Sequence, residues 1–454
     1  MIRRLAAAAL LLWAGSAAAD PYAFTWDAGV QGATADLLAL TVFHSDVVNT
    51  GENVGQYRVT MTVEAPAAWV TSMCEGDFCY APFIRTFDFS LSPGAHNDIG
   101  ANITAVTDPG RGLVSITVAS LDDPGLSITH AFTVVTPGFD VLIVDADPAG
   151  DPVPLTAAAL GLAGKSAVAW SADLVGAPDA ASLAPFSAVI WSTGAAVTGL
   201  DAGARTALDA FATNGGLVWL NGSKLVFGQC FSGSPAYDSQ GRAWMGLVAG
   251  VDWAAALPAP GSVAGVPGDE LGDGLAVGLG GGDGADNSPS PDALLAVGGG
   301  FAALQYPGSQ AAAVRRVWGA GRVVTMGFTF EAVSSAADRA ALATAVFDWA
   351  ATGVSAAPAP DAPGLAAHAA PNPFNPRTLI TWIAPAEGAA TEVTVHDLRG
   401  RRVRQLVLGR VAAGPQSCAW DGRDDAGRTL PGGLYLVRIR AGARATTLKL
   451  TLAK

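Results

Sequence analysis

The chain has 454 residues and a formal net charge of −13 at pH 7, with 50% hydrophobic and 14% charged residues. Its length suggests about three domains of ~150 residues each, and its composition is typical of globular domains and excludes a largely disordered chain. The charge is uneven: residues 371–454 hold 13 Lys and Arg against 6 Asp and Glu, whereas residues 1–370 hold 13 against 33. An acidic body disfavours nucleic acid as a partner.

The N-terminus has the pattern of a targeting segment. Arg3 and Arg4 precede an apolar run from Leu5 to Ala14, and three alanines, 17–19, stand before Asp20. We therefore predict a cleaved signal peptide over residues 1–19 and export through the inner membrane. The apolar run is too short for a permanent span, and no later stretch has about 18 uninterrupted apolar residues, so we expect no transmembrane segment in the mature chain.

Residues 20–137 are expected to form β-structure. Tyr57, Val59, Met61 and Val63 alternate with polar or small residues, which indicates a strand with one buried face. Seven such segments are separated by turns rich in Gly, Pro and Asp: 37–42, 56–64, 69–73, 83–91, 100–107, 112–120 and 127–135. This spacing predicts an Ig-like or fibronectin-like β-sandwich. Three scattered histidines lack metal-ligand spacing and are interpreted as surface or packing residues: His44, His96 and His130.

Four cysteines fit an exported protein that depends little on disulfides. Cys74 and Cys79 bracket four residues, and a disulfide closing this hairpin-like loop is the favoured interpretation. Free thiols and a partial metal site are the alternatives. Cys230 and Cys418 have no evident partners in the sequence.

The pattern changes near residue 138. Residues 139–145 are almost continuously apolar, as in a strand buried on both faces. Helices are expected at 153–163, 201–213 and 338–350, and strands at 166–171, 187–192, 216–221, 301–306, 311–317 and 322–328. Alternating strands and helices predict a largely parallel sheet, with the last three strands as an antiparallel extension. We place this α/β domain at residues 138–352.

Two runs carry a resemblance for this domain: DAGARTALDAFATNGGLVWLNG at 201–222 and GAGRVVTMGFTFEAV at 319–333. They resemble the class I glutamine amidotransferase-like superfamily, which implies a flavodoxin-like fold. Enzymes of that family use a cysteine on a tight glycine-flanked turn together with a histidine and a glutamate. Here residues 192–195 contain no cysteine, Cys230 follows a different strand, and no histidine occurs between His130 and His368. The resemblance therefore predicts the fold without the catalytic pair.

Carboxylates follow two strands of the expected sheet. Asp145 and Asp147 stand where the first parallel strand should end, Asp151 comes next, and Glu331 follows the strand that ends at residue 328. Ligands bind at the carboxyl ends of such strands, and carboxylates suit a hard cation. Turn and helix-capping contacts by the aspartates are the favoured alternative. We name Asp145, Asp147 and Glu331 as binding candidates, and we predict no catalytic residue, no resident metal and no cofactor.

Residues 256–300 are rich in Gly, Pro and Asp, and we expect an insertion loop there. Their glycine runs lack the phosphate-loop motif, and their aspartates lack calcium-loop spacing. The tryptophans on or beside expected elements are interpreted as core: Trp219, Trp318 and Trp349. Core packing is also favoured for Trp244 and Trp253, with a sugar- or peptide-binding cleft as the alternative.

An Ala- and Pro-rich linker is predicted at 353–370, and a final domain at 371–454. The domain opens with a stiff, proline-fixed segment whose one large apolar residue is Phe374. Six strand-like runs follow: 378–383, 391–398, 403–408, 416–420, 434–439 and 446–452. Several alternate with period two and are separated by turn residues, so we expect a small antiparallel sandwich.

The runs PNPFNPRT, VHDLRGRRVRQL, AGPQSCAWDGRDDAGRTLPGGLYLVRIRAG and TTLKLTLAK resemble the C-terminal sorting domain of type IX secretion substrates. They are equally similar to the related Ig-like domain named after the flagellar hook-capping protein. The residues that carry the motif are Pro371, Asn372, Pro373, Phe374, Asn375, Pro376, Trp420, Asp421 and Gly422. The resemblance implies carriage across the outer membrane by a secretion machinery, often with removal of the domain.

From these patterns we expect an exported bacterial protein, secreted or displayed at the cell surface. Its body would be non-catalytic and would bind a cell-surface polysaccharide or another extracellular ligand. The alternative is a secreted hydrolase that uses Asp145, Asp147 and Glu331, with or without a metal. A further alternative treats the tail as an ordinary Ig-like module with no role in export.

Overall fold

The computed structural model describes residues 20–352, 367–384, 390–397, 401–412, 414–441 and 444–453. The signal peptide predicted for 1–19 and most of the linker predicted for 353–370 lie outside these residues. The chain forms two compact units. The first comprises the residues up to Gly32 with Asp36–Asp108 and Gly112–Val134, and the second comprises Ala33–Ala35, Pro109–Arg111 and the chain from Val135 onward.

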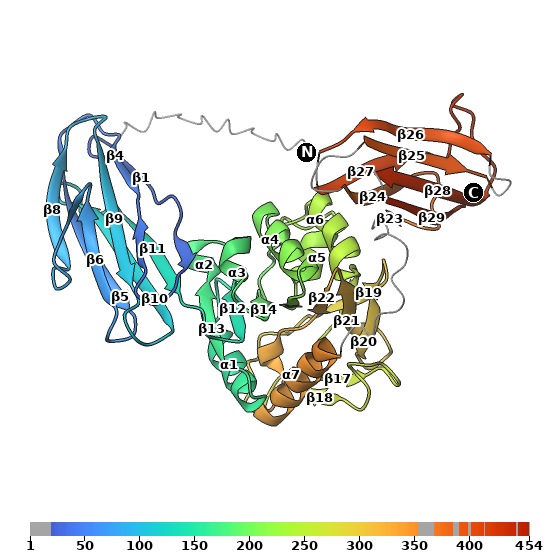
Figure 1. The fold of residues 1–454 in the computed structure, drawn as a ribbon, viewed down its shortest axis with the longest axis horizontal. Coiled ribbons are helices and arrows are strands. Elements are labelled where there is room, and N and C mark those ends of the chain that lie inside the picture. Colours follow the sequence, from blue (N-terminus) through green and yellow to red (C-terminus); the bar gives the residue numbers. More distant parts are fainter. Residues whose placement is uncertain are drawn as a thin grey trace, which may run out of the picture. The chain divides into compact units, whose positions relative to one another are not determined.

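Residues 20–135 form two antiparallel sheets (Figure 1), one of six strands in the order β1-β4-β9-β6-β7 with β3 paired to β9, and one of five in the order β2-β11-β10-β5-β8. The strands are β1 Phe24–Asp27, β2 Gly32–Thr34, β3 Leu40–Phe43, β4 Asp46–Asn49, β5 Gly55–Glu64, β6 Val70–Glu75, β7 Phe78–Cys79, β8 Thr86–Leu91, β9 His96–Thr104, β10 Arg111–Ser120 and β11 Ser127–Val135. The four strands not expected from the sequence, β1, β2, β4 and β7, have at most four residues, too few to show a periodic pattern.

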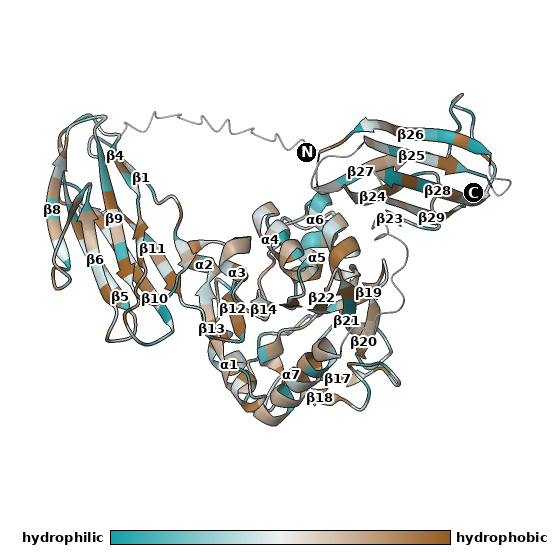
Figure 2. Ribbon diagram, viewed as in Figure 1, coloured by the Kyte–Doolittle hydropathy of each residue, from teal (hydrophilic) through white to brown (hydrophobic). Residues whose placement is uncertain are grey.

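The two sheets pack face to face through alternating residues. Along β5 buried and exposed residues alternate, as expected from the period of a half-buried strand. Phe24 of β1 packs against Tyr57 of β5 with ring centroids 5.2 Å apart, and Phe43 of β3 lies 5.4 Å from Phe132 of β11. Figure 2 shows hydrophobic and hydrophilic residues interleaved along these strands. The shared core therefore lies between the sheets.

The central part of the second unit is built on an eleven-stranded sheet in the order β13-β12-β14-β15-β22-β21-β20-β17-β18, with β19 paired to β21 and β16 paired to β19. Its strands are β12 Val141–Asp145, β13 Ala167–Ser171, β14 Ala188–Ser192, β15 Leu217–Asn221, β16 Val251–Ala256, β17 Ser262–Gly265, β18 Ala276–Gly278, β19 Asp292–Ala296, β20 Phe301–Gln305, β21 Ala311–Trp318 and β22 Gly321–Met326. The five strands from β13 to β22 are parallel, and β21 pairs antiparallel to β22. The parallel sheet with an antiparallel extension is thus present.

Helices cover both faces of the parallel strands. They are α1 Val153–Leu162, α2 Ala172–Val175, α3 Ala180–Leu183, α4 Ala202–Thr213, α5 Leu225–Cys230, α6 Ser239–Trp244, the π-helix η1 Met245–Ala249, the 3₁₀ helix η2 Phe330–Ala332 and α7 Ala336–Ala351. Helices α1 and α7 share one core cluster with Val141, Ile143 and Trp219, whereas α4 lies against β15 and β22 outside that cluster. Strands β12, β14, β15 and β22 are therefore buried on both sides, as continuous apolar sequence indicates, whereas β13 at the edge of the sheet is partly exposed.

Residues 256–300 are not a single insertion loop. They contribute β17, β18 and β19, which extend the sheet beyond β20 and β21. These strands have three to five residues each and stand among Gly and Asp turns. The sequence suggests a loop because the apolar stretches in this region are very short. Val263 and Val277 are nevertheless buried, because neighbouring strands pack against them.

The C-terminal part of the second unit forms a three-stranded sheet, β23-β24-β27, and a four-stranded sheet, β26-β25-β28-β29, both antiparallel. The strands are β23 Ala367–Ala370, β24 Thr378–Ala384, β25 Ala390–His396, β26 Arg402–Arg410, β27 Gly414–Trp420, β28 Gly433–Ala441 and β29 Arg444–Leu452. Strand β23 lies inside the segment predicted as linker, because its alanines pair with β24 and Ala369 joins the core. This domain therefore begins by residue 367.

Among the described residues, no helix is both long enough and apolar enough to cross a membrane.

Candidate functional site

The carboxylates predicted from the sequence meet at the carboxyl edge of the parallel strands. Asp145 ends β12, and Asp147 follows two residues later, while Glu331 lies in η2 after β22. All three are buried. The edge is completed by buried hydroxyl and amide side chains at the ends of β14 and β15: Ser192, Thr193, Asn221 and Ser223. The sequence predicted that carboxylates lie at this edge of the sheet, but it did not single out these four residues. Ser, Thr and Asn are common in turns, so their presence after a strand gives no signal of a site.

The aspartates make the turn and capping contacts that were the favoured interpretation. Asp145 Oδ1 accepts from the Asp147 amide at 3.1 Å, and Asp147 Oδ1 accepts from the Ala149 amide at 3.1 Å. Asp151 Oδ1 accepts from the amide of Val153, the first residue of α1, at 3.2 Å. These bonds orient the turn that leads from β12 into α1. Within the described parts of the chain, no group of three or more His, Cys, Asp or Glu is placed to hold a metal ion.

Burial changes the acidity of Asp145. Removal from water raises the pKa of its carboxyl from 3.8 to about 7, and the nearby charges of Asp173, Asp151 and Asp147 act in the same direction. The hydrogen bond from the Asp147 amide opposes this rise in pKa without cancelling it. The carboxyl therefore titrates near neutral pH, which is the range in which a general acid or base is most effective in catalysis.

Glu331 is the most enclosed carboxylate of the edge, with 2% of its surface exposed. Its Oε1 accepts from Asn287 Nδ2 at 2.7 Å, and Asn287 Oδ1 in turn accepts from Thr329 Oγ1 at 2.6 Å. Burial raises the pKa of Glu331, with the charge of Asp147 adding to the effect. Its Oε2 has no hydrogen-bond partner among the described residues.

Two glycines allow polar side chains to approach the backbone at this edge. A Cβ on Gly194, whose φ is +54°, would lie 1.9 Å from Asp147 Oδ2. A Cβ on Gly222 would lie 2.0 Å from Thr193 Oγ1. The Thr193 and Ser223 hydroxyls are buried without a partner in the described structure. The edge is therefore a buried, polar cluster in which these hydroxyls have no hydrogen-bond partner among the described residues.

The cysteine nearest to this edge in sequence is enclosed by the fold. Cys230 ends α5 and is 2% exposed. Burial raises the pKa of its thiol well above the usual range, and the charge of Asp252 adds to this. The thiol is therefore protonated at neutral pH and weakly nucleophilic. No histidine stands between His130 and His368, so no imidazole from the central sequence can deprotonate it.

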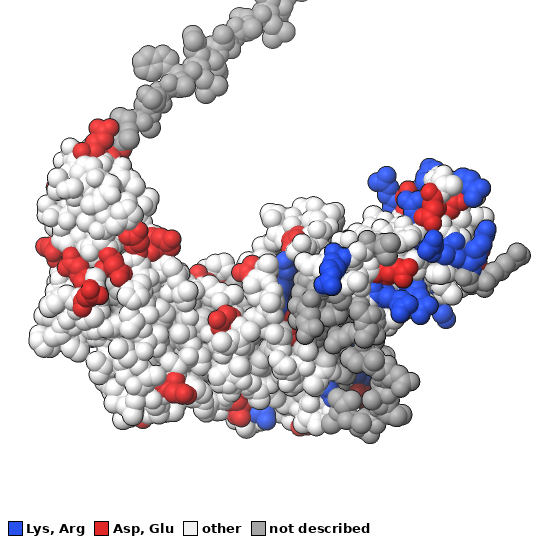
Figure 3. Space-filling model, turned by 45° about the horizontal axis from the view of Figure 1, so that its top comes forward, with Lys and Arg blue, Asp and Glu red and all other residues white. Residues whose placement is uncertain are grey.

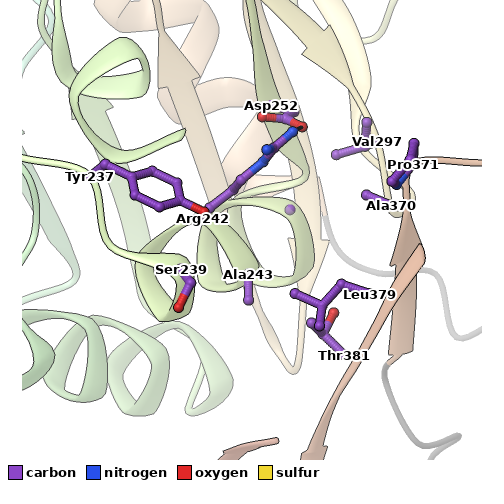
Figure 4. A pocket seen from close by; sticks show the side chains of 11 residues that line it. Tyr237, Ser239, Arg242, Ala243, Asp252, Val297, Ala370, Pro371, Leu379 and Thr381 are labelled. Carbon is purple, nitrogen blue, oxygen red and sulfur yellow. Dashed lines mark hydrogen bonds and ion pairs between the residues drawn. The ribbon is translucent and has the colours of Figure 1, made fainter. Parts of the chain in front are cut away.

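Beside α6 the structure has a pocket of about 350 Å³ (Figure 4). Tyr237, Ser239 and Arg242 line it together with residues of β23 and β24 and with Pro371 of the predicted motif, which lies between these two strands. Arg242 Nη2 donates to Asp252 Oδ2 at 2.6 Å, so the two charges in this pocket neutralise each other.

The tryptophans fall mainly in the core. Trp219, Trp349 and Trp244 are at most 2% exposed. Trp318 is partly buried and donates from Nε1 to Asp209 at 2.6 Å. Trp253 is also partly buried and packs against the rings of Phe227 and Phe231 at 5.4 and 4.9 Å.

In the first unit, a disulfide joins Cys74 and Cys79, which are cross-strand neighbours on β6 and β7. The three histidines of this unit do not contact one another in the described interactions. His44 and His96 lie at the surface beside Asp98 and Asp46 at 2.7 and 2.8 Å, and His130 packs edge-on against Trp26.

The PNPFNP segment is part of the C-terminal domain's fold. Phe374 donates from its amide to the Thr451 carbonyl at 2.9 Å, and its own carbonyl accepts from the Ala453 amide at 2.8 Å. The Asn372 side chain accepts from the Thr451 amide at 2.8 Å and donates to the Lys449 carbonyl at 2.9 Å. The segment therefore holds the last strand, β29, along its free edge.

The aromatic motif residues meet inside this domain. The ring of Phe374, 1% exposed, lies 5.1 Å from that of Trp420, which lies 5.3 Å from Tyr435. Trp420 Nε1 donates to the Arg423 carbonyl at 3.1 Å, across the turn that contains Asp421 and Gly422. The turn requires glycine at 422, where φ is +69°. Aromatic residues far apart in sequence thus form one cluster.

Comparison with known proteins identifies this domain. Residues 375–444 match the FlgD Ig-like domain family, so the chain carries a C-terminal Ig-like domain of the FlgD type. A structure of FlgD from P. aeruginosa shares 29% identity, covering 16% of this chain and 58% of that one with a TM-score of 0.14. No curated protein matches the sequence of this chain.

Two other solved structures are similar over parts of the chain. The N-terminal domain of PorA shares 14% identity over 25% of this chain and 97% of that one, with a TM-score of 0.20. The exo-β-1,4-mannosidase Op5Man5 from an Opitutaceae bacterium shares 15% identity over 47% of this chain, with a TM-score of 0.31. This chain spans 36% of the mannosidase.

Proposed function

We propose that this chain is an exported bacterial protein, secreted or held at the cell surface, whose FlgD-type domain serves as the signal for a type IX-like route. The observation that carries the proposal is the FlgD Ig-like match at 375–444 together with the PNPFNP segment paired to β29. Because the stiff PNPFNP segment is hydrogen-bonded to the last strand, the entry segment and the last residues of the domain lie side by side. A secretion machinery could recognise them together as one folded surface. The signal-peptide pattern at residues 1–19 supports the first export step.

The body then acts by binding. The central sheet supports a flavodoxin-like arrangement, because its parallel strands follow the order β13-β12-β14-β15-β22, the second, first, third, fourth and fifth in sequence. The similarity to glutamine amidotransferases is proposed at the level of fold. A protonated, buried Cys230 and the lack of a histidine between 130 and 368 argue against that family's chemistry. The ligand class we propose is a cell-surface polysaccharide or another extracellular molecule.

Export is tested by three versions of the chain in the producing cell: intact, lacking 367–454, and lacking 20–134. The deletion starts at 367 because a cut at 371 would leave β23 without its partner strand. We expect the intact chain and the chain lacking 20–134 outside the cell, and the chain lacking 367–454 inside it. The intact mass of the exported protein shows whether residues 1–19 and the tail are removed.

Export of the version lacking 367–454 at the normal level would reject the sorting role. The tail would then be an ordinary Ig-like module. A reporter carrying only a signal peptide and residues 367–454 separates the cases further, because an export signal should move it across the outer membrane and a structural module should not.

A secreted hydrolase is the second candidate. The observation that favours it is the pair of buried carboxyls with raised pKa at the strand ends, Asp145 at about 7 and Glu331. Hydrolysis of nitrophenyl glycosides and esters should then depend on pH with a midpoint near 7 and should be lost in Glu331→Gln. Activity that is equal in wild type and Glu331→Gln, or lacking in both, would reject this candidate.

A further inference from the structure

The outer face of the four-stranded sheet β26-β25-β28-β29 carries an excess of positive charge. The inner face of this sheet builds the core with Val393, Val395, Val437 and Ile439. Because side chains alternate along a strand, the residues between them point outward. Five exposed cations lie on this outer face: Arg402, Arg410, Arg438, Arg440 and Lys449. We call these five residues the basic face.

The strand register places these cations across the whole sheet. Lys449 lies opposite Leu436, which lies opposite His396, which lies opposite Arg402. One step along, Arg438 lies between Thr447 and Thr394, and the next step brings Arg440 beside Glu392. Arg410 lies opposite Ala390, one further step away. With strands ~4.8 Å apart and successive outward residues ~7 Å apart, the cations span roughly 14 Å by 20 Å.

Within the described residues, the charges of the basic face have no ion-pair partner, in contrast to Arg401, Arg423 and Arg428 of the neighbouring loops. Three loop arginines have an acidic neighbour: Arg401 with Asp397, Arg423 with Asp421, and Arg428 with Asp424. None of the five cations of the basic face forms an ion pair with a residue that the structure describes. Glu392 is the only acidic residue among the described outward positions of these strands. Figure 3 shows Lys and Arg gathered over the C-terminal domain, while Asp and Glu predominate over the first unit.

We propose that the basic face binds the phosphate headgroups of an anionic lipid surface. The cations are spread in two dimensions over a flat sheet, as a planar array of headgroups requires. Among the described outward positions there is no Phe, Tyr or Trp, and His396 is the one aromatic ring on which a base or a sugar could stack. A linear polyanion would follow the diagonal of Lys449, Arg438, Arg440 and Arg410 and leave Arg402 aside, whereas a planar array of headgroups engages all five cations.

The acidic remainder of the chain does not prevent this binding. At physiological ionic strength charges separated by more than about 8 Å are largely screened, so the residues in contact with the surface decide the interaction. Each Lys or Arg held near an anionic membrane contributes about 1 kcal/mol, a factor of about five in partitioning. The binding does not depend on the proposed export route, since it concerns the folded domain after or without export.

The test uses the purified mature chain and sedimentation with vesicles containing about one third phosphatidylglycerol in phosphatidylcholine, the anionic component that basic residues require. Arg438→Gln, Arg440→Gln and Lys449→Gln together should lower the partition coefficient roughly 100-fold. The matched control, Arg401→Gln, Arg423→Gln and Arg428→Gln together, has the same net charge and should stay within a few-fold of wild type.

Three results would overturn the proposal. Wild-type protein that does not sediment with these vesicles would show that the face binds no such surface. Equal losses in the two triple variants would show that net charge alone acts. Retention on soluble dextran sulfate without vesicle binding would assign the face to a polysaccharide. Thermal unfolding of both variants confirms that each is folded, and failure of this test leaves the export proposal untouched because no secretion step is involved.

Discussion

Replacing Phe374 by alanine should unfold the C-terminal domain well before the rest of the chain. The ring is 1% exposed and packs 5.1 Å from Trp420, while the backbone on both sides of it is bonded to β29. Removing the ring leaves a cavity between the two sheets and loosens the clamp on the last strand.

The size of the effect follows from burial. Truncation of a buried phenylalanine to alanine costs about 3–5 kcal/mol, through lost transfer energy and the cavity left behind. A domain of this size has only about 5–15 kcal/mol of stability in total. The substitution therefore removes a large fraction of it and should lower the domain's midpoint by roughly 10 °C or more, since 1 kcal/mol shifts a small domain by about 4–8 °C.

The chain has several domains, so a single unfolding free energy does not describe it. Calorimetry that separates the transitions, combined with hydrogen exchange at the Thr451 and Ala453 amides, reports the C-terminal domain alone. These two amides donate to Asn372 and Phe374. We expect a lower transition for this domain, faster exchange at both amides and unchanged transitions elsewhere.

Phe83→Ala is the matched control, because it removes the same atoms from a side chain that is 81% exposed. It should change every transition by less than about 0.5 kcal/mol, as surface substitutions do. If Phe374→Ala had no more effect than Phe83→Ala, the entry segment would not be part of the domain's core, and the reasoning would be refuted.

Three further outcomes are expected in the central part of the second unit. Because burial raises the pKa of Asp145 from 3.8 to about 7, the folded chain keeps a proton there that the unfolded chain loses. This proton stabilises the folded chain at low pH by at most about 4 kcal/mol, and the stabilisation is lost as the pH rises from about 4 through 7. Asp145→Asn should remove this dependence of the unfolding free energy on pH, as denaturation at a series of pH values would show. Gly194→Ala should destabilise by roughly 1–3 kcal/mol more than Gly164→Ala, because both have positive φ but only position 194 places a Cβ 1.9 Å from the Asp147 carboxylate; equal denaturation midpoints would contradict this. Cys230, buried and with a raised thiol pKa, should react with iodoacetamide far more slowly in native than in unfolded protein, as peptide mapping would show; rapid native labelling would reopen a nucleophilic role.

The elements with strong periodic patterns could be predicted from the sequence. The continuous apolar run that became β12 and the alternation along β5 and β28 depend on side chains within one element. The helices α4 and α7 begin at capping residues, Asp201 and Ser335, whose side chains accept from amides three residues on. These features are local, so the sequence alone determines them.

The strands inside residues 256–300 and β23 could not be predicted in this way. They are three to five residues long, and some, such as Ala367–Ala370, are compositionally loop-like or linker-like. Each is stabilised by hydrogen bonds to a neighbouring strand, so it exists only where that strand is already in place. The sequence does not show which neighbour will be present.

The candidate carboxylates illustrate the same division. Their place at the strand ends followed from the β–α pattern, because parallel strands bring their carboxyl ends to one edge. Their chemistry did not, since the rise in the pKa of Asp145 and Glu331 results from burial by residues distant in sequence.

The sequence by itself determined that this chain has a signal-like start, β and α/β segments, and a tail with the PNPFNP and Trp-Asp-Gly motifs, because each is a local pattern of residue types. Only the tertiary structure decided that Phe374 clamps the last strand, that Arg401, Arg423 and Arg428 pair with aspartates, and that five cations on neighbouring strands have no ion-pair partner among the described residues. These are properties of strand register, and register is fixed by which faces are buried when the sheets pack.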